Sequence, residues 1–118
     1  MSAVIKKEYG TITIDAEVIK RVAGIAAMDC YGIVGMAAKS VKDDVFRLLK
    51  LETLTKGVIL EISENNLSIK LHIIVEYGTN IQAITKAMIE NVKYHVENLV
   101  GLNVSSIEIF VEGIRVER

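Results

Sequence analysis

The chain has 118 residues, of which 51% are hydrophobic and 25% charged, and its 14 basic and 15 acidic residues give a formal net charge of -1. This hydrophobic content excludes a disordered chain, and the near-zero net charge offers no global attraction to nucleic acid or anionic lipid. The sequence has no proline or tryptophan and only 5% aromatic residues, which disfavours an aromatic-lined ligand groove. We therefore expect one soluble domain over residues 1–118 with an aliphatic core.

Three features indicate a cytoplasmic location without direct membrane insertion. No apolar run approaches the roughly 18 residues that span a bilayer. The first ten residues, MSAVIKKEYG, lack the apolar stretch of a signal peptide. The single cysteine, Cys30, cannot form an internal disulfide, which suits a reducing compartment.

The first third of the chain predicts a strand, a helix and a second short strand. Residues 9–15 alternate isoleucine with threonine and read as a strand, with Asp15 placed to cap the next element. A slim, alanine-rich helix is predicted from Ala16 to about Tyr31, ended by Gly32, and residues 33–37 form a short strand or connector. The apolar positions of this helix are Val18, Ile19, Val22, Ala23, Ile25 and Ala26.

Residues 39–56 are the least determined part, because they combine helical spacing with most of the local charge. Ser40 with Asp43 is suited to cap a helix there. Some of its apolar residues would lie outside the inward stripe, so we predict partner contact here. The candidate interaction surface consists of Val41, Val45, Phe46, Leu49, Leu51 and Leu54.

The second half of the chain has the strongest pattern. Residues 57–63 and 67–77 alternate as two antiparallel strands joined by a tight turn at residues 64–66. Thr79 with Gln82 fits a capping box at the start of a long helix that Gly101 ends. Its predicted inward residues are Ile81, Ile84, Met88, Ile89, Val92, His95, Val96 and Leu99. Residues 104–116 form the last strand, with a bulge expected at Gly113.

The predicted order is therefore strand, helix, strand, helix, strand, strand, helix, strand. This order indicates an α+β fold with a single small domain, in which one mixed or antiparallel sheet has helices packed on one face.

No residue pattern predicts an active site. His72 lies on the polar face of its strand and His95 on the inward side of the long helix, so nothing brings them together as metal ligands. Cys30 has no adjacent histidine and reads as a small buried residue. Two carboxylate groups, Asp43-Asp44 with Glu52 and Glu61 with Glu64, are typical of solvated surface. We predict no catalytic residue, no metal site and no cofactor.

One short motif raises nucleic-acid binding as an alternative. Residues 32–35, GIVG, match the GxxG of RNA-binding KH modules. That loop clamps phosphates, whereas Ile33 and Val34 offer no side-chain donor. A KH-like module is thus the least favoured of three functional hypotheses.

Two longer stretches resemble a known family. They are residues 9–37 and residues 56–114, and the second contains VEYGTNI, then ENVK, VGL and finally VEGI. Together they resemble the alkaline shock proteins of Gram-positive bacteria, which are also called general-stress or cell-envelope stress response proteins. The resemblance implies a non-enzymatic cytoplasmic protein that self-associates or acts as a scaffold. Some members are recruited to the membrane by an anchoring partner, which implies a membrane-proximal location.

From these observations we expect a scaffold or interaction protein linked to cell-envelope stress and homeostasis. It would form a homo-oligomer or dock a membrane-anchoring or envelope-metabolism protein, through an unpaired edge strand or the apolar side of residues 41–54. The alternative is an accessory or regulatory subunit of an enzyme of lipid or envelope metabolism.

Overall fold

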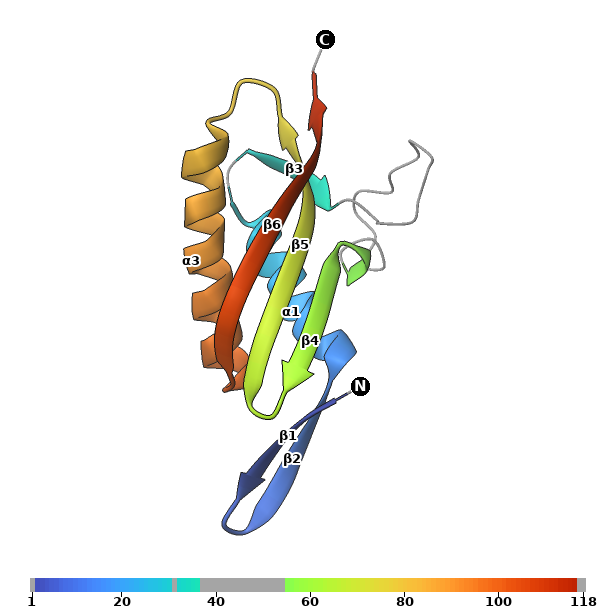
Figure 1. The fold of residues 1–118 in the computed structure, drawn as a ribbon, viewed down its shortest axis with the longest axis vertical. Coiled ribbons are helices and arrows are strands. Elements are labelled where there is room, and N and C mark those ends of the chain that lie inside the picture. Colours follow the sequence, from blue (N-terminus) through green and yellow to red (C-terminus); the bar gives the residue numbers. More distant parts are fainter. Residues whose placement is uncertain (1, 31, 37–54, 117–118) are drawn as a thin grey trace.

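The long strand β5 (Asn66–Glu76) is the centre of the fold. The structure is a computed structural model that describes residues 2–30, 32–36 and 55–116. Strand β6 (Asn103–Arg115) pairs parallel with β5 along its whole length. The other edge of β5 holds two antiparallel strands end to end, β4 (Val58–Ser63) and β3 (Ile33–Met36). We call these four strands the main sheet; β6 lies at one side of it (Figure 1).

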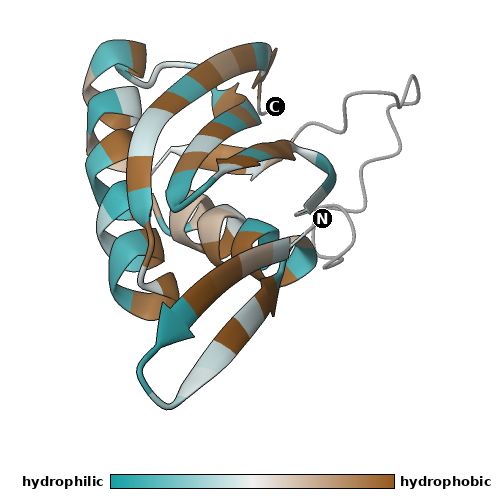
Figure 2. Ribbon diagram, turned by 60° about the horizontal axis from the view of Figure 1, so that its bottom comes forward, coloured by the Kyte–Doolittle hydropathy of each residue, from teal (hydrophilic) through white to brown (hydrophobic). Residues whose placement is uncertain are grey.

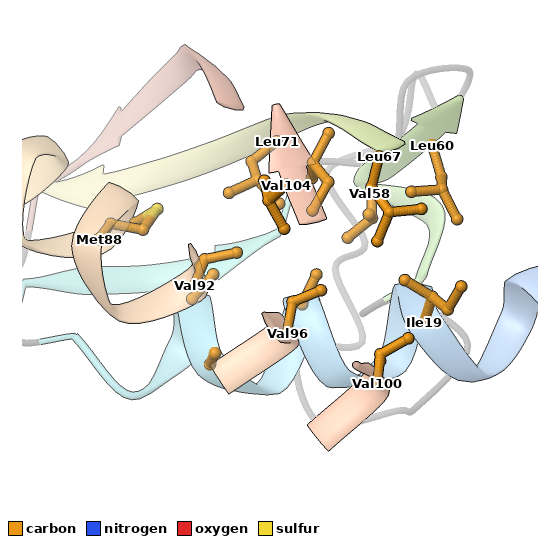
Figure 3. Close-up of a cluster of buried hydrophobic side chains, with 14 of the residues drawn as sticks. Ile19, Val58, Leu60, Leu67, Leu71, Met88, Val92, Val96, Val100 and Val104 are labelled. Atoms are coloured by element: carbon orange, nitrogen blue, oxygen red, sulfur yellow. The ribbon is translucent and has the colours of Figure 1, made fainter. Parts of the chain in front are cut away.

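Helices α1 (Ala16–Met28) and α3 (Ile81–Val100) cover one face of the main sheet and contact each other. Side chains from this face of the sheet and from both helices meet in one cluster (Figure 3). The residues of β5 that point to the helices are all essentially inaccessible, namely Leu67, Ile69, Leu71, Ile73 and Val75. The predicted α+β class, with helices on one face, is confirmed. We call the opposite side of the main sheet, on which neither α1 nor α3 packs, the open face.

A hairpin arm, made of β1 (Ser2–Lys7) and β2 (Gly10–Asp15), stands apart from the main sheet. The prediction contained only the second of these strands. Ala3 and Ile5 pack the base of the arm against the core, with the Ile5 side chain next to Gly101. The rest of the arm extends past the end of the main sheet, with hydrophobic residues along both strands (Figures 1 and 2).

Helix α1 is shorter than predicted and turns a narrower face inward. It ends at Met28 instead of about residue 31, because Cys30 donates its backbone N–H to Ala27, three residues back, instead of to the carbonyl four residues back. Val18 and Ile25, which were predicted to point inward, are each about half exposed. The buried face is built from small residues at helical spacing and from Ile19. A helix that approaches the sheet through alanines buries only this narrow stripe.

Both ends of helix α3 lie within one residue of their predicted positions. Its N-cap is Asn80, whose Oδ1 accepts a hydrogen bond from the Ala83 N–H, so the predicted cap at Thr79 was wrong by one residue. The Thr79 hydroxyl instead donates to the carbonyl of Glu76. Gly101 adopts the left-handed conformation that ends the helix, as predicted.

The inward face of α3 was predicted correctly at its centre and wrongly at its ends. Met88, Val92 and Val96 are fully buried. Leu99 is 70% exposed and Val100 takes its place in the core, because a period of 3.6 residues carries the buried stripe from Val96 to Val100. Ile81 and Ile89 are also exposed.

The helix predicted within residues 39–56 lies outside the described residues over positions 39–54. The same holds for all six residues of the predicted interaction surface: Val41, Val45, Phe46, Leu49, Leu51 and Leu54.

We predict that Gly32→Ala destabilises the protein more than Gly78→Ala does. Both glycines have a positive φ, so each alanine costs about 1–2 kcal/mol of backbone strain. A Cβ at position 32 would also overlap the Ile84 side chain and come within 2.9 Å of Thr79 Cγ2, whereas position 78 faces open space. The overlap should lower the free energy of unfolding by roughly a further 1–3 kcal/mol. Urea unfolding of both variants measures the difference; equal losses would contradict this packing.

Candidate interaction surface

Strand β6 is paired along one edge and has no pairing partner along the other among the residues that the structure describes. All its pairing partners in the described part of the chain belong to β5, on one side. Backbone N–H and C=O groups on the other side of residues 105–114 therefore make no hydrogen bond within residues 2–30, 32–36 and 55–116. Such a row of unpaired groups is a template for pairing with another chain.

Glu97 of α3 caps the beginning of β6. Its Oε2 accepts one hydrogen bond from the Val104 backbone N–H and another from Lys93 Nζ, each at 3.0 Å. The bond from Val104, together with that from Lys93, holds the pKa of the Glu97 carboxyl below its usual value. The first residues of the strand are thus fastened to the helix, and its free edge begins after them.

Burial decreases along the helix-facing side of β6. Val104, near the start, is buried, whereas Val111 is 37% and Ile114 53% exposed. The partners of these last two residues on β5, Ile73 and Val75, are fully buried. The outer segment, which we define as residues 111–116 and which consists of the end of β6 and the residue after it, therefore reaches beyond the part of β5 that the helices cover.

On the open face, His72 of β5 forms a small cluster with two residues of β6. Its ring stacks on Phe110 with ring centroids 4.8 Å apart, and its Nδ1 lies 2.7 Å from Glu112 Oε2. His72 is on the predicted face but is only 6% exposed. Its Nε2 is buried and has no hydrogen-bond partner among the described residues. The cluster ties β6 to β5 on the side opposite the helices.

The other residues considered for chemistry are not brought together. His95 lies on α3, on the opposite side of the sheet from His72, and its Nδ1 is 3.0 Å from the Asn91 carbonyl. The thiol of Cys30 is near the Ala26 carbonyl, and burial, with a smaller effect of Asp29, raises its pKa. No group of three or more potential metal ligands occurs within the described ranges.

Glu61 and Glu64 are exposed, on β4 and in the turn after it, while Asp43, Asp44 and Glu52 lie outside the described residues. The GIVG motif is not a free loop, because Ile33 and Gly35 pair with β5 as part of β3.

A groove of about 440 Å³ lies between the end of α1 and the first half of α3. It is lined by Asp29, Cys30, Ala83, Ile84, Ala87 and Asn91. The amide of Asn91 is already engaged, since its Nδ2 donates to the Ala26 carbonyl at 2.8 Å. The groove thus offers few free polar groups to orient a ligand.

The hairpin arm carries a second exposed apolar region. Tyr9 at its turn is 95% exposed, and Val4 and Ile12 are each nearly half exposed. A two-stranded hairpin is marginally stable alone, and only the base of this one packs on the core.

We predict that removing Glu112 from the His72–Glu112 pair destabilises the protein more than removing His72 does. Glu112→Leu leaves the buried Nδ1 of His72 without an acceptor and should lower the free energy of unfolding by about 1–3 kcal/mol. His72→Phe removes both buried nitrogens, keeps a ring against Phe110 and leaves Glu112 to solvent, so it should change stability by less than about 1 kcal/mol. Urea unfolding of the two variants tests this. A large loss for His72→Phe would mean that the imidazole has a further partner.

Comparison with known proteins agrees with the resemblance drawn from the two stretches. The model of the alkaline shock protein 23 family, described as having a cell envelope-related function, matches residues 4–116. The Bacillus subtilis (strain 168) protein YloU is 44% identical over 117 residues, 98% of either chain. The Streptococcus pyogenes serotype M6 protein Spy1614 is 32% identical over 117 residues, which cover 98% of this chain and 97% of that one.

More distant relatives carry names that refer to stress. A stress response regulator Gls24 homolog of Streptococcus pyogenes serotype M3 is 24% identical over 106 residues, 90% of this chain and 59% of its own length. No solved structure matches the chain. No helix within residues 2–30, 32–36 and 55–116 is long and apolar enough to cross a membrane. By the match over residues 4–116, the chain belongs to the alkaline shock protein 23 family, a family with a cell envelope-related function and stress-associated members.

Proposed function

We propose that the protein is a non-enzymatic cytoplasmic scaffold linked to cell-envelope stress and homeostasis, and that it works by self-association or by docking a partner protein. The observation that carries this proposal is the edge of the 13-residue strand β6 that no described residue pairs with. Natural proteins usually blunt a long edge strand or cover it. The edge of β6 carries the bulge near Gly113 and the charges of Glu108 and Glu112, which partly blunt it, but its outer end exposes apolar residues and therefore favours a surface used in assembly.

The hairpin arm supports the same function. It places an exposed tyrosine and β-branched residues at one end of a molecule whose principal dimensions are 57 × 28 × 19 Å. A projecting two-stranded element with free edges gains stability when another chain covers it. The molecule thus offers two separate apolar contact regions, the arm and the outer segment of β6.

The polar groups best suited to chemistry have structural partners, which supports a role without catalysis. His72 contacts Glu112, His95 contacts the Asn91 carbonyl, and the Cys30 thiol contacts Ala26. The raised pKa of Cys30 makes its thiol a weaker nucleophile at neutral pH.

We predict that the purified protein gains mass as its concentration rises through the micromolar range, because the β6 edge can pair between copies. Light scattering coupled to size-exclusion chromatography measures this over a concentration series. Ile114→Lys, which puts a charge on the exposed end of β6, should reduce the gain, with the matched exposed change Val18→Lys on α1 as control.

A protein that stays monomeric at every concentration would contradict self-association. If such a monomer formed a stoichiometric complex only with one purified enzyme of lipid or envelope metabolism, the accessory-subunit hypothesis would replace the scaffold.

A further inference from the structure

We propose that the partner of β6 is a second copy of this chain, paired antiparallel through the outer segment, so that Glu112 of each copy faces Arg115 of the other. This inference rests on the proposed self-association and specifies its site and register. The pairing relates the copies by a two-fold axis, which is the commonest symmetry of soluble homo-oligomers.

The position of the contact follows from where β6 is free. Its first residues are closed by the bond from Val104 to Glu97. Exposure then rises toward the other end, where Val111, Ile114 and Val116 are uncovered. An incoming strand gains both unpaired backbone groups and apolar contact only at this end.

The register follows from charge. An antiparallel pairing centred on Phe110 would place Glu108 of one copy opposite Glu112 of the other, twice in each dimer. Like charges directly opposite destabilise a strand pair. A pairing centred between Gly113 and Ile114 instead places Glu112 opposite Arg115, again twice, and opposite charges stabilise it.

The two charged residues lie on the same face in this register, and at its centre Gly113, on the open face and without a side chain, lies opposite Ile114 on the helix-facing side. Glu112 is on the open face, where it meets His72. Arg115 is on the same face. It lies opposite Glu76 of β5, and Glu76 is four residues after His72 and therefore on the same face of β5 as His72. The bulge near Gly113 adds one residue to β6 relative to β5. Glu112 and Arg115, which are three positions apart, therefore lie on the same face instead of on opposite faces.

Apolar residues complete the contact on the helix-facing side. The same register sets Val111 of one copy opposite Val116 of the other, and both are exposed in the single chain. Because β5 and β6 are parallel, α3 begins at the end of the sheet where β6 finishes. The exposed Ile81 in the first turn of α3 is therefore at the same end as this segment.

The charge pattern itself favours a second copy over an unrelated protein. The four residues 112–115 have an acid at one end and a base at the other, so the segment is complementary to itself when reversed. An isologous interface needs this property, whereas a contact with a different chain does not.

The test uses two charge reversals, separately and mixed. Glu112→Arg and Arg115→Glu each place like charges opposite each other at two positions of the dimer, so each should raise the dimer Kd about ten-fold or more. In an equimolar mixture, both positions regain opposite charges and a heterodimer should form with a Kd near that of the parent. Sedimentation velocity on each variant and on the mixture measures this.

Glu108→Arg is the matched control, because position 108 has no opposing charge in the proposed register, and its Kd should change by less than about three-fold. Circular dichroism on each variant checks that loss of the Glu112–His72 bond has not unfolded it. If Glu112→Arg does unfold, Arg115→Glu with Glu112→Gln replaces the mixture, and this double variant should dimerise better than Arg115→Glu alone.

If neither charge reversal changes the dimer Kd, the proposed register is wrong, while the proposed scaffold function is unaffected. Weakening by both without recovery in the mixture would also overturn the register, since the two residues would then not face each other. A parent protein that never associates would overturn self-association together with this inference.

Discussion

The structure depends on the burial of one side of β5. Its five helix-facing side chains are removed from solvent almost completely, and burying an aliphatic side chain of this size stabilises a fold by about 1.5–3 kcal/mol. That burial requires a helix layer on one face and a strand on each edge. Helices α1 and α3 provide the layer, β3 and β4 share one edge, and β6 takes the other. The remaining contacts of the molecule are arranged around this strand.

The free edge of β6 is a consequence of the same arrangement. The chain leaves β5, crosses the sheet as α3 and returns as a parallel strand, which places β6 beyond β5. Among the described strands, none comes after it to close the sheet. Glu97 accepts a hydrogen bond from the beginning of β6, and the His72 cluster packs on the open face of the strand farther along. The end of β6 is therefore its most exposed part. The strand is thus well anchored in its own chain and still available to another.

The sequence predicted the parts of the fold that local pattern determines. Alternation located β4 and β5 and assigned the faces of β5, and glycines located the end of α3 and the bulge in β6. It did not predict β1, because the apolar residues Ala3, Val4 and Ile5 of this short strand are consecutive and show no alternation. The capping residue of α3 was misplaced because Thr79 and Asn80 are both good caps, and only the backbone geometry selects between them.

The candidate surface was less predictable than the fold. An unpaired edge strand was expected, but periodicity does not show which strand lies at an edge, since that depends on pairing between distant segments. The burial of His72 was missed for the same reason: its cover includes Phe110 and Glu112, which lie about forty positions away. The alternative surface predicted in residues 41–54 lies outside the described residues and remains a prediction.

The most direct test of the central claim is hydrogen exchange of the β6 backbone amides at low and high protein concentration. If the outer segment of β6 is the contact between copies, its amides exchange more slowly as the concentration rises, while those of β5, already paired on both edges, do not change. Exchange in β6 that is the same at every concentration, in a sample that light scattering shows to be associated, would contradict the account.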